Sequence, residues 1–295
     1  MWDFEHEPWR SRMAASYRLE WMMPSECAAR LALPREAPQA ADLGLVPIAA
    51  LATNPELILV PGCAIAATRR VRSLLLIRRE DQPLSAIRTV AADTSSRATL
   101  AYTKILFREW WQTGNGPEFR PHKPDTDAML ESADAALVIG DPALFALEER
   151  LNREERTGEK LVYHDLAEEW IALAGVPWVS AVWAVRKSAL THDGPVRERQ
   201  MLETIAADTC ASRDRGLANM ETLVAEWSAR LPLAAGTIRD YLTENISYHL
   251  DAECLNGMRE FYRLAAKHGV LPAYSLSSIA VSSLRTPIAA TRHRR

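Results

Sequence analysis

The segment Asp93-Thr94-Ser95-Ser96-Arg97 places hydroxyl side chains where a helix is expected to begin. It follows the apolar run 86–92 and opens the amphipathic stretch 95–111. This order predicts a short buried strand leading into a helix N-terminus, where hydroxyls and free backbone N–H groups can hold an anion such as a carboxylate. Because Ser and Thr also cap helices that bind nothing, the local pattern leaves an anion site and a plain helix cap equally open.

Three other positions place polar residues at the ends of predicted elements. Ser25 stands at a helix start, Ser73 lies on the apolar run 71–77, and Gly140-Asp141 stands where a strand turns into a helix. Glycine permits close backbone approach at that turn, and Asp141 is expected to cap the helix. Each position also has a purely structural interpretation, as a cap at Ser25 and a well-formed turn at Gly140-Asp141. Together they favour binding an anion and stabilising charge over supplying a strong base.

Basic side chains flank Ser73 and can balance the charge of a dianion. They are Arg69, Arg70 and Arg72. Since arginine is mostly exposed in proteins, each of them is also compatible with an ordinary surface position.

The usual catalytic and cofactor signatures are missing from the sequence. It contains no P-loop, GxGxxG, HExxH or GxSxG motif, and none of its seven histidines stands beside a strand-end Ser or Asp. The four cysteines show no CxxC pairing and no metal-ligand spacing, which predicts reduced thiols. We therefore expect no cofactor and no metal.

Composition indicates an ordinary globular protein with a small-molecule ligand. The chain has 295 residues, 48% hydrophobic and 25% charged, with a net charge of −3 and a pI near 6.2. These values give no electrostatic reason to expect nucleic acid or a membrane as partner. No signal-like N-terminus and no apolar run of about 18 residues occurs, so we expect a cytoplasmic location. The oligomeric state stays open.

Alternation of apolar runs with amphipathic segments predicts a parallel α/β body. Beyond residue 196 helical periodicity dominates, which predicts a helical C-terminal section. The expected strands are 18–23, 43–47, 57–60 (closed by Pro61-Gly62), 71–77, 86–92, 135–139 and 178–185. The expected helices include 95–111, 126–133, 165–174, 197–213, 216–230, 235–248 and 251–268.

Two long apolar runs, 71–77 and 178–185, bracket about a hundred residues that contain their own strand–helix units. This arrangement predicts two lobes joined by two crossing strands. The first lobe is expected over residues 1–80 and the second over 81–177, with 178–295 returning to the first lobe and adding the C-terminal helices. Ligands in such α/β folds bind beside the carboxyl ends of strands and helix N-termini.

Taken together, the motifs resemble the chorismate dehydratases of the futalosine route to menaquinone. The resemblance runs from the first residues to about residue 271. It is carried by Asp93-Thr94-Ser95-Ser96-Arg97, Ile139-Gly140-Asp141-Pro142-Ala143-Leu144, Val71-Arg72-Ser73-Leu74-Leu75-Leu76, Asp165-Leu166-Ala167-Glu168-Glu169-Trp170, Ala181-Val182-Trp183-Ala184 and Tyr241-Leu242-Thr243-Glu244-Asn245-Ile246-Ser247-Tyr248.

The resemblance implies a periplasmic-binding-protein-like type II fold that acts as an enzyme. The implied reaction removes water from chorismate and gives 3-[(1-carboxyvinyl)oxy]benzoate. Ser95 and Ser96 are the expected catalytic anchors. The expected substrate-binding residues are Thr94, Arg97, Ser25, Ser73, Gly140 and Asp141. A cleft of hydroxyls and helix N-termini fits a substrate with two carboxylates.

One family feature has no match here. Family members begin with a strand ending in a Tyr-Leu-Asn-Thr-x-Pro-Leu-like segment whose Asn lines the active site, whereas this chain begins Met1-Trp2-Asp3. We therefore expect the first strand to be missing, either because the start codon was placed too late or because the protein is shortened. The alternative functions are a non-catalytic solute-binding protein and the 1,4-dihydroxy-6-naphthoate synthase of the same pathway; the Asp93–Arg97 motif argues against the latter.

Overall fold

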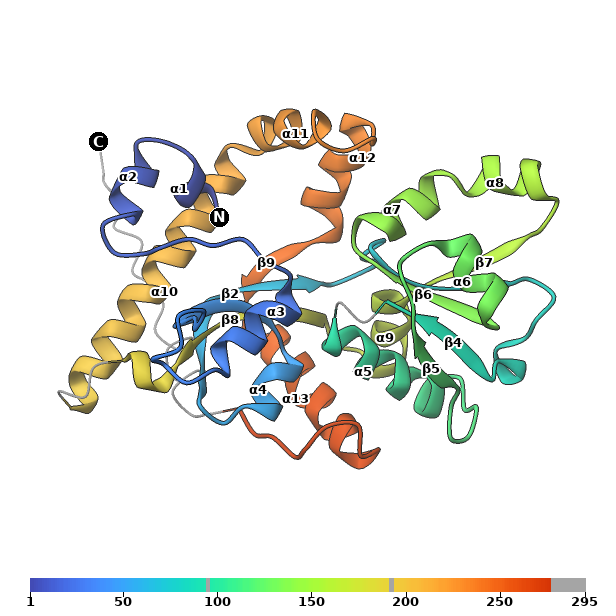
Figure 1. The fold of residues 1–295 in the computed structure, drawn as a ribbon, viewed down its shortest axis with the longest axis horizontal. Helices are drawn as coiled ribbons and strands as arrows, with labels where there is room; N and C mark the ends of the chain where they lie inside the picture. The colour runs from blue at the N-terminus through green and yellow to red at the C-terminus, as the bar shows by residue number, and fades with distance from the viewer. Residues whose placement is uncertain (94–95, 191–193, 277–295) are drawn as a thin grey trace.

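Two β-sheets lie side by side in the computed structural model, which describes residues 1–93, 96–190 and 194–276 (Figure 1). A four-stranded sheet has the order β1-β8-β2-β9, and a five-stranded sheet has the order β5-β4-β6-β3-β7. The first contains β1 (Leu43–Pro47), β8 (Trp178–Arg186), β2 (Leu57–Ala67) and β9 (Ser247–Leu250). The second contains β5 (Glu118–Pro121), β4 (Thr89–Ala92), β6 (Ala135–Ile139), β3 (Leu74–Arg79) and β7 (Leu161–Asp165).

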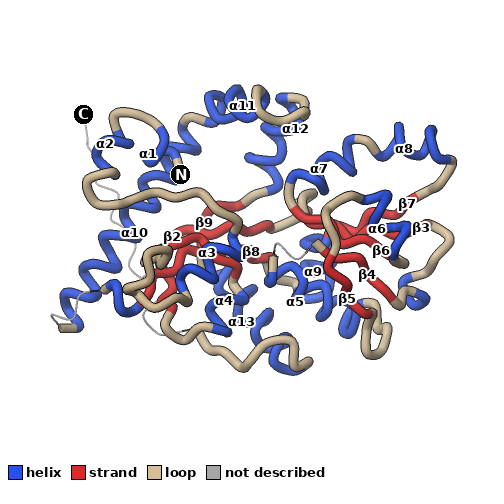
Figure 2. The backbone as a smooth tube through the Cα atoms, viewed as in Figure 1, coloured by secondary structure: helices blue, strands red, loops and turns tan. Residues whose placement is uncertain are grey.

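Helices surround both sheets (Figure 2). The four-stranded sheet packs against α3 (Pro24–Leu31), α4 (Ala49–Thr53), α10 (Pro195–Ala218) and α13 (Ala252–Lys267), with α1 (Trp2–Glu5) on α10 and α2 (Trp9–Met13) beside α1. The chain runs from α10 through α11 (Met220–Ser228), α12 (Ala235–Asp240) and the π-helix η4 (Tyr241–Asn245) into β9. The five-stranded lobe carries α5 (Arg97–Ile105), the π-helix η2 (Leu106–Trp110), α6 (Thr126–Ser132), α7 (Asp141–Glu148), α8 (Arg150–Thr157) and α9 (Leu166–Ala174). Short 3₁₀ turns occupy η1 (Leu84–Ala86) and η3 (Lys187–Ala189).

The short apolar runs form strands where they were expected. The strands β1 and β6 have the predicted bounds, and β8 is one residue longer than predicted. In β6, Ala135, Ala136, Leu137 and Val138 are completely buried, because helices cover both faces of the sheet. A continuous apolar run is the sequence pattern that such a two-sided environment requires.

Two strand predictions were wrong, and two others began three residues too early, since β3 starts at Leu74 and β4 at Thr89. Residues 18–23 form no strand, because a strand needs a hydrogen-bonded neighbour and this segment has none; β1, at the edge of the sheet, pairs only with β8 among the described residues. The pair Pro61-Gly62 does not end β2, which continues to Ala67. A register shift between Leu59 and Ala64 and the positive φ of Gly62 (99°) mark a bulge, which accommodates a proline within a strand.

The sheets are mixed rather than parallel. Only β4 pairs in parallel, with β5 and β6, whereas β3 is antiparallel to β6 and β7, and β8 is antiparallel to β1 and β2. The chain passes from the first sheet to the second before β3 and returns to the first sheet at β8. Each of these two strands runs opposite to its neighbours, which makes their pairs antiparallel. The strands β5, β7 and β9 were not predicted, and the helix expected over 235–248 ends at Asn245.

The strand pairing bears on the lobe boundaries. The strand β3 pairs only with strands of the five-stranded sheet, so the chain crosses between the sheets over residues 68–73. We therefore propose to shift the first boundary from residue 80 to this crossing segment. The other boundaries, at 177 and 295, stay as predicted from the sequence.

A buried aromatic cluster joins the two lobes. Tyr102 of α5 stacks on Trp178 of β8 with ring centroids 3.7 Å apart, and lies 4.2 Å from Phe261 of α13 and 4.7 Å from Trp170 of α9. All four side chains are completely buried. Close aromatic packing of this kind fixes α5 relative to both sheets. The N-terminus of α5, which follows β4, is fixed with it.

Candidate functional site

The ends of β4 and β6 and the beginning of β3 meet at one edge of the five-stranded sheet. Ala92 aligns with Leu137 in the parallel pair, and the N–H of Asp93 donates to the Leu137 carbonyl at 3.0 Å. On the other side of β6, the N–H of Gly140 donates to the carbonyl of Ser73 at 2.7 Å. Neighbouring strands lie about 4.8 Å apart and β6 lies between β4 and β3, so these contacts gather the polar segments of three strands within roughly 10 Å. We refer to Ser73, Ser96, Gly140 and Asp141 as the sheet-edge site; Thr94 and Ser95 lie outside the described residues.

Ser96 is the N-cap of α5. Its Oγ accepts hydrogen bonds from the Thr99 N–H at 3.2 Å and from the Thr99 hydroxyl at 3.0 Å. A serine hydroxyl has two acceptor positions and one proton, so both acceptor positions are taken from inside the helix. The capacity that remains is donation by the Ser96 O–H. The helix cap and the anion donor, which the sequence left as alternatives, are therefore compatible in the same residue.

Ser73 is held from two sides. It is only 5% exposed, and its Oγ accepts a hydrogen bond at 3.0 Å from the hydroxyl of Tyr241 on η4. Burial raises the pKa of Tyr241, so its hydroxyl keeps the proton that it donates. With the Ser73 carbonyl bound to Gly140, both the backbone and the side chain of Ser73 are fixed relative to α7.

The helix α7 begins differently from the sequence prediction. Gly140, with φ of 76° and ψ of −144°, is the N-cap, whereas Asp141 is the first helical residue, exposed and without a capping hydrogen bond. Only glycine adopts this backbone conformation without strain, so the prediction that Asp141 caps the helix was wrong. No side chain caps this helix, but Pro142 has no N–H and the Ala143 N–H donates to the Gly140 carbonyl at 3.0 Å. The Asp141 N–H is therefore the donor that the first turn of α7 offers at the positive end of the helix dipole.

Arg97 and Ser25 occupy different surroundings. Arg97 is the first residue of α5 and is exposed, where the helix dipole does not stabilise a cation. Ser25 is half-buried on α3, which packs against β1 of the other sheet, and the N-cap of that helix is Met23. Ser25 is therefore not a cap, and within the described chain no hydrogen bond joins it to the sheet-edge site.

A buried carboxylate fixes the segment that leads into Ser73. Asp165 accepts backbone hydrogen bonds from Val71 at 2.9 Å and Arg72 at 2.6 Å, as well as from Ala167 and Glu168 at the start of α9. Burial raises the pKa of Asp165, while these four N–H groups act in the opposite direction. Arg72 has a φ of 63°, which is unusual for a residue with a Cβ. Asp165 thus stabilises the turn that aims Ser73 at the sheet edge.

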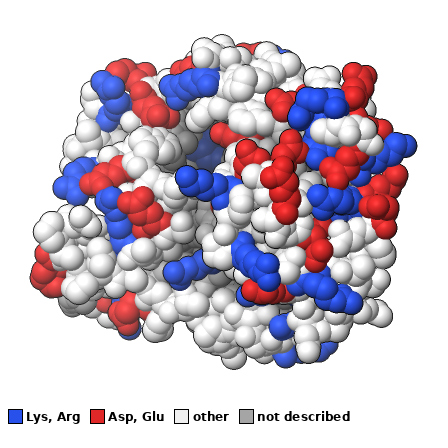
Figure 3. All heavy atoms as spheres, turned by 45° about the vertical axis from the view of Figure 1, so that its right-hand side comes forward, with Lys and Arg blue, Asp and Glu red and all other residues white. Residues whose placement is uncertain are grey.

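The three arginines beside Ser73 are not equivalent. The guanidinium of Arg72 forms an ion pair with Glu148 at 2.7 Å, so its charge is compensated within the protein. Arg69 and Arg70 are exposed on the crossing segment. Figure 3 shows a hollow between the lobes with basic side-chain atoms visible inside it. A hollow of this kind raises the local concentration of anions.

Other candidate sites lie elsewhere. Among the described residues, one surface pocket lies between η2 and β5 (with Lys104, Arg108 and Phe119) and another beside α8 (with Arg150, Glu154 and Tyr163). None of the sheet-edge residues lines either pocket. Within residues 1–93, 96–190 and 194–276, no group of three or more His, Cys, Asp or Glu side chains is arranged to hold a metal ion. No helix in this part of the chain combines the length and the apolar character that crossing a membrane requires.

Sequence reasoning missed Tyr241 and the role of Asp165. The carboxylate of Asp165 stands directly before a helix, and this N-cap signal was detectable, but nothing local indicated that it also binds residues 71 and 72. Tyr241 lies 168 residues from Ser73 in the chain. No local pattern pairs residues so far apart.

Comparison with known proteins agrees with this architecture. The chain is 27% identical over 210 residues to a protein named chorismate dehydratase from Thermus thermophilus, with 69% of this chain and 71% of that protein covered. A protein of Archaeoglobus fulgidus superposes with a TM-score of 0.54 at 12% identity, covering 92% of this chain and 94% of the other.

Solute-binding proteins show the same fold. The alkanesulfonate-binding protein SsuA of Xanthomonas axonopodis pv. citri superposes with a TM-score of 0.53 at 12% identity, over 81% of this chain and 79% of the other. The predicted periplasmic-binding-protein-like fold, with α/β lobes and a helical C-terminal section, is confirmed. The sequence model of the family described as menaquinone biosynthesis matches residues 24–267, which is most of the chain. This protein belongs to the menaquinone biosynthesis family.

Proposed function

We propose that the protein is a chorismate dehydratase, a hydro-lyase that converts chorismate to 3-[(1-carboxyvinyl)oxy]benzoate on the futalosine route to menaquinone. The observation that carries the proposal is the sheet-edge site, where Ser96 has both acceptor positions filled by Thr99 and keeps its proton for donation. Family membership and the similarity to the Thermus enzyme support the choice of substrate.

The donors of the sheet-edge site match a dicarboxylate. Chorismate carries two carboxylates, and charge-assisted hydrogen bonds from hydroxyls and helix N-terminal N–H groups are the interactions that such groups form best. Ser96 follows β4 and Ser73 precedes β3, on either side of β6, and we assign them to the substrate together with the Asp141 N–H at the start of α7. Ser95, Thr94, Arg97, Gly140 and Asp141 remain proposed site residues, and Ser25 is proposed to contribute from the opposite lobe.

The chemistry requires loss of a ring proton and of the neighbouring hydroxyl, which leave together as water while the ring becomes aromatic. No His belongs to the described residues of the sheet-edge site. We propose that the enolpyruvyl carboxylate of the substrate accepts the ring proton. The protein then contributes orientation of the substrate and stabilisation of the developing charge. We propose further that it acts in the cytoplasm without a cofactor.

The test is to incubate the protein with chorismate and to follow formation of the aromatic product by absorbance and mass spectrometry. We expect turnover that is lost in Ser96→Ala and Ser73→Ala and retained in Ser228→Ala, a matched hydroxyl deletion on α11 whose Oγ bonds only to the Val224 carbonyl. Equal turnover in all four proteins contradicts the site assignment.

The alternative is a non-catalytic solute-binding protein, favoured by the structural likeness to alkanesulfonate-binding proteins. Calorimetry with chorismate separates the two functions in the same experiment. Saturable binding without product supports the solute-binding function, and absence of both binding and turnover overturns the proposal as a whole.

A further inference from the structure

Two thiols from distant parts of the chain face each other outside the sheet-edge site. Cys63 lies on β2 and Cys210 on α10, and their Sγ atoms are 3.6 Å apart. Cys63 is 5% exposed, whereas Cys210 is half-buried and reachable from solvent. A disulfide needs the sulfurs at about 2.05 Å, so they must approach by roughly 1.5 Å, which is within the reach of side-chain rotation.

The backbone next to Cys63 makes room for this approach. A Cβ at Gly62 would lie 2.4 Å from the Cys210 Sγ, which is closer than atoms can pack. Gly62 also has a φ of 99°, a conformation that residues with a side chain rarely adopt. The glycine therefore allows α10 to bring Cys210 directly over β2.

The cation of Arg213 favours a thiolate on Cys210, whereas the carboxylate of Asp214 acts against it. The guanidinium of Arg213 donates to the Gly62 carbonyl at 2.6 Å and lies 3.6 Å from the Cys63 Sγ, while Asp214 binds the same guanidinium at 2.8 Å. The amino group of Met1 also interacts electrostatically with Cys63. A hydrogen bond from Cys63, together with the charge of Arg213, lowers the pKa of Cys210 to about 7, whereas the same contact and burial raise the pKa of Cys63. A thiolate is the nucleophilic form of cysteine.

We propose that Cys63 and Cys210 form a reversible intramolecular disulfide when the protein meets a peroxide. The Cys210 thiolate attacks one peroxide oxygen, the O–O bond breaks, and the sulfur becomes a sulfenic acid while the other oxygen leaves as water after protonation. The Cys63 sulfur then attacks the Cys210 sulfur, the S–O bond breaks, and the second oxygen also leaves as water. Together the two thiols lose two electrons, and one peroxide molecule is reduced to two waters. A dithiol reductant reverses the reaction.

The other two cysteines have no such partner. Cys27 is buried between α3 and β1, where it touches Gly44, and the Cys254 thiol donates to the His249 carbonyl at 3.4 Å. They serve as internal controls, since a non-specific oxidant would modify exposed thiols without linking any defined pair.

The disulfide links α10 to β2 just before the crossing segment 68–73, which carries the chain to Ser73. It closes a loop of almost half the chain, and a cross-link across a long loop stabilises the folded state chiefly by restricting the unfolded chain. We expect the oxidised protein to unfold about 5 °C above the reduced protein.

The experiment treats the full-length protein with a small excess of hydrogen peroxide, followed by alkylation and intact-mass and peptide mass spectrometry. We expect the free thiols to fall from the four cysteines of the sequence to two, with a mass loss of two hydrogen atoms and one linked peptide pair containing Cys63 and Cys210. The reaction should persist in Cys27→Ser and Cys254→Ser and be absent in Cys63→Ser and Cys210→Ser.

A second variant keeps the proposal testable if either cysteine variant folds poorly. Arg213→Gln retains both thiols but removes the cation, and we expect its rate of disulfide formation to fall about tenfold at neutral pH. Four free thiols after peroxide treatment, a linkage to another cysteine, or addition of oxygen to Cys210 without a disulfide would each overturn the proposal. These readouts need no substrate, so they do not depend on the proposed dehydratase activity.

Discussion

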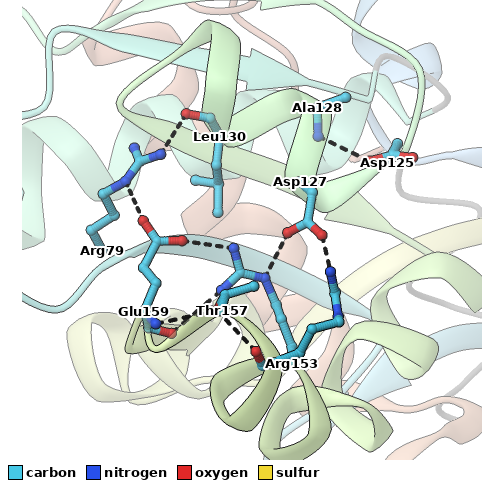
Figure 4. Close-up of polar contacts among 9 residues, drawn as sticks. Arg79, Asp125, Asp127, Ala128, Leu130, Arg153, Thr157 and Glu159 are labelled. Atoms are coloured by element: carbon cyan, nitrogen blue, oxygen red, sulfur yellow. Dashed lines mark hydrogen bonds and ion pairs between the residues drawn. The ribbon is translucent and has the colours of Figure 1, made fainter.

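Two polar regions of the five-stranded lobe differ in how completely their groups are paired. In the ion-pair network (Arg79, Asp127, Arg153, Arg156 and Glu159), Arg153 bridges Asp127 at 2.6 Å and Glu159 at 2.7 Å, and Arg79 binds Glu159 at 2.6 Å (Figure 4). Every guanidinium drawn there meets a carboxylate of opposite charge. The network connects α6, α8, the strand β3 and Glu159, which lies between α8 and β7.

The sheet-edge site is paired on one side only. Thr99 fills the acceptor positions of Ser96, Tyr241 binds Ser73, and the N-terminus of α7 carries no capping side chain. The capacity that Ser96 keeps is donation by its O–H.

The comparison separates groups that stabilise the fold from groups that are available for a ligand. A matched network has little left to offer an incoming molecule, whereas pre-positioned donors lower the cost of binding an anion. Substitutions in the ion-pair network should therefore change the free energy of unfolding, whereas substitutions in the sheet-edge site should change kcat/KM.

The largest effect is expected for Ser96→Asp. An aspartate caps a helix as well as serine does, but it cannot donate a proton when ionised and it repels a carboxylate. We expect chorismate turnover, as kcat/KM, to fall by roughly 10³-fold or more, while the unfolding midpoint stays close to that of the parent. Turnover at the parental level would show that Ser96 is only a cap.

The next largest effect is expected for Asp165→Ala. The change removes the acceptor of four backbone N–H groups, in a buried position. We expect a loss of about 3 kcal/mol in the free energy of unfolding, measured by urea titration with tryptophan fluorescence. The matched control is Asp125→Ala, which removes a cap that accepts one N–H, from Ala128, and should cost about 1 kcal/mol. Equal losses would contradict the role of Asp165 in holding residues 71 and 72.

Arg153→Gln tests the network itself. The Arg153 side chain is 12% exposed and has two carboxylate partners, whereas Arg156 is 66% exposed and contacts Asp127 alone, at 3.3 Å. We expect Arg153→Gln to lower the free energy of unfolding by about 2 kcal/mol and Arg156→Gln by less than about 0.5 kcal/mol. Both variants should retain parental kcat/KM, and a large loss of turnover in either would remove the distinction between the two regions.

Tyr241→Phe tests whether the position of Ser73 depends on its partner. The variant keeps the ring and removes only the hydroxyl that donates to Ser73. One neutral hydrogen bond contributes about 1 kcal/mol, so we expect kcat/KM to fall about fivefold. Tyr248→Phe is the control, because that hydroxyl donates to the Leu242 carbonyl instead; an equal loss in both would indicate a structural effect.

The smallest effect is a pH dependence of the network. Hydrogen bonds from Arg153 hold the pKa of both Asp127 and Glu159 below their ordinary values. A carboxylate with a lowered pKa in the folded state stabilises the protein above its unfolded-state pKa, and this contribution is lost as the pH falls through the folded-state value. The difference in stability between the parent and Arg153→Gln should therefore shrink between about pH 5 and pH 3. A constant difference over this range would contradict the ionic origin of the effect.

Much of the fold followed from local patterns. Apolar runs predicted β1, β6 and β8 almost residue by residue, and in β6 and β8 the reason is that both faces of the strand are largely buried. The prediction failed at residues 18–23, where the pattern suited a strand but no neighbouring strand was present to pair with it. It also failed at β9, because four residues after a π-helix are too few to show the alternation of a strand. Strand formation depends on a partner elsewhere in the chain, and a local pattern cannot supply it.

The sequence by itself determined the family, the α/β class and the hydroxyl-rich segment that precedes α5. These depend on residues adjacent in the chain, whose conformational preferences act locally. Only the tertiary structure decided that Ser73, Ser96 and Gly140 share one edge, that Asp165 holds the crossing segment, that Tyr241 reaches Ser73 and that Cys63 meets Cys210. Those contacts join residues that are far apart in the sequence. They form because the two sheets and α10 pack in one arrangement, and in that arrangement these polar groups find their partners.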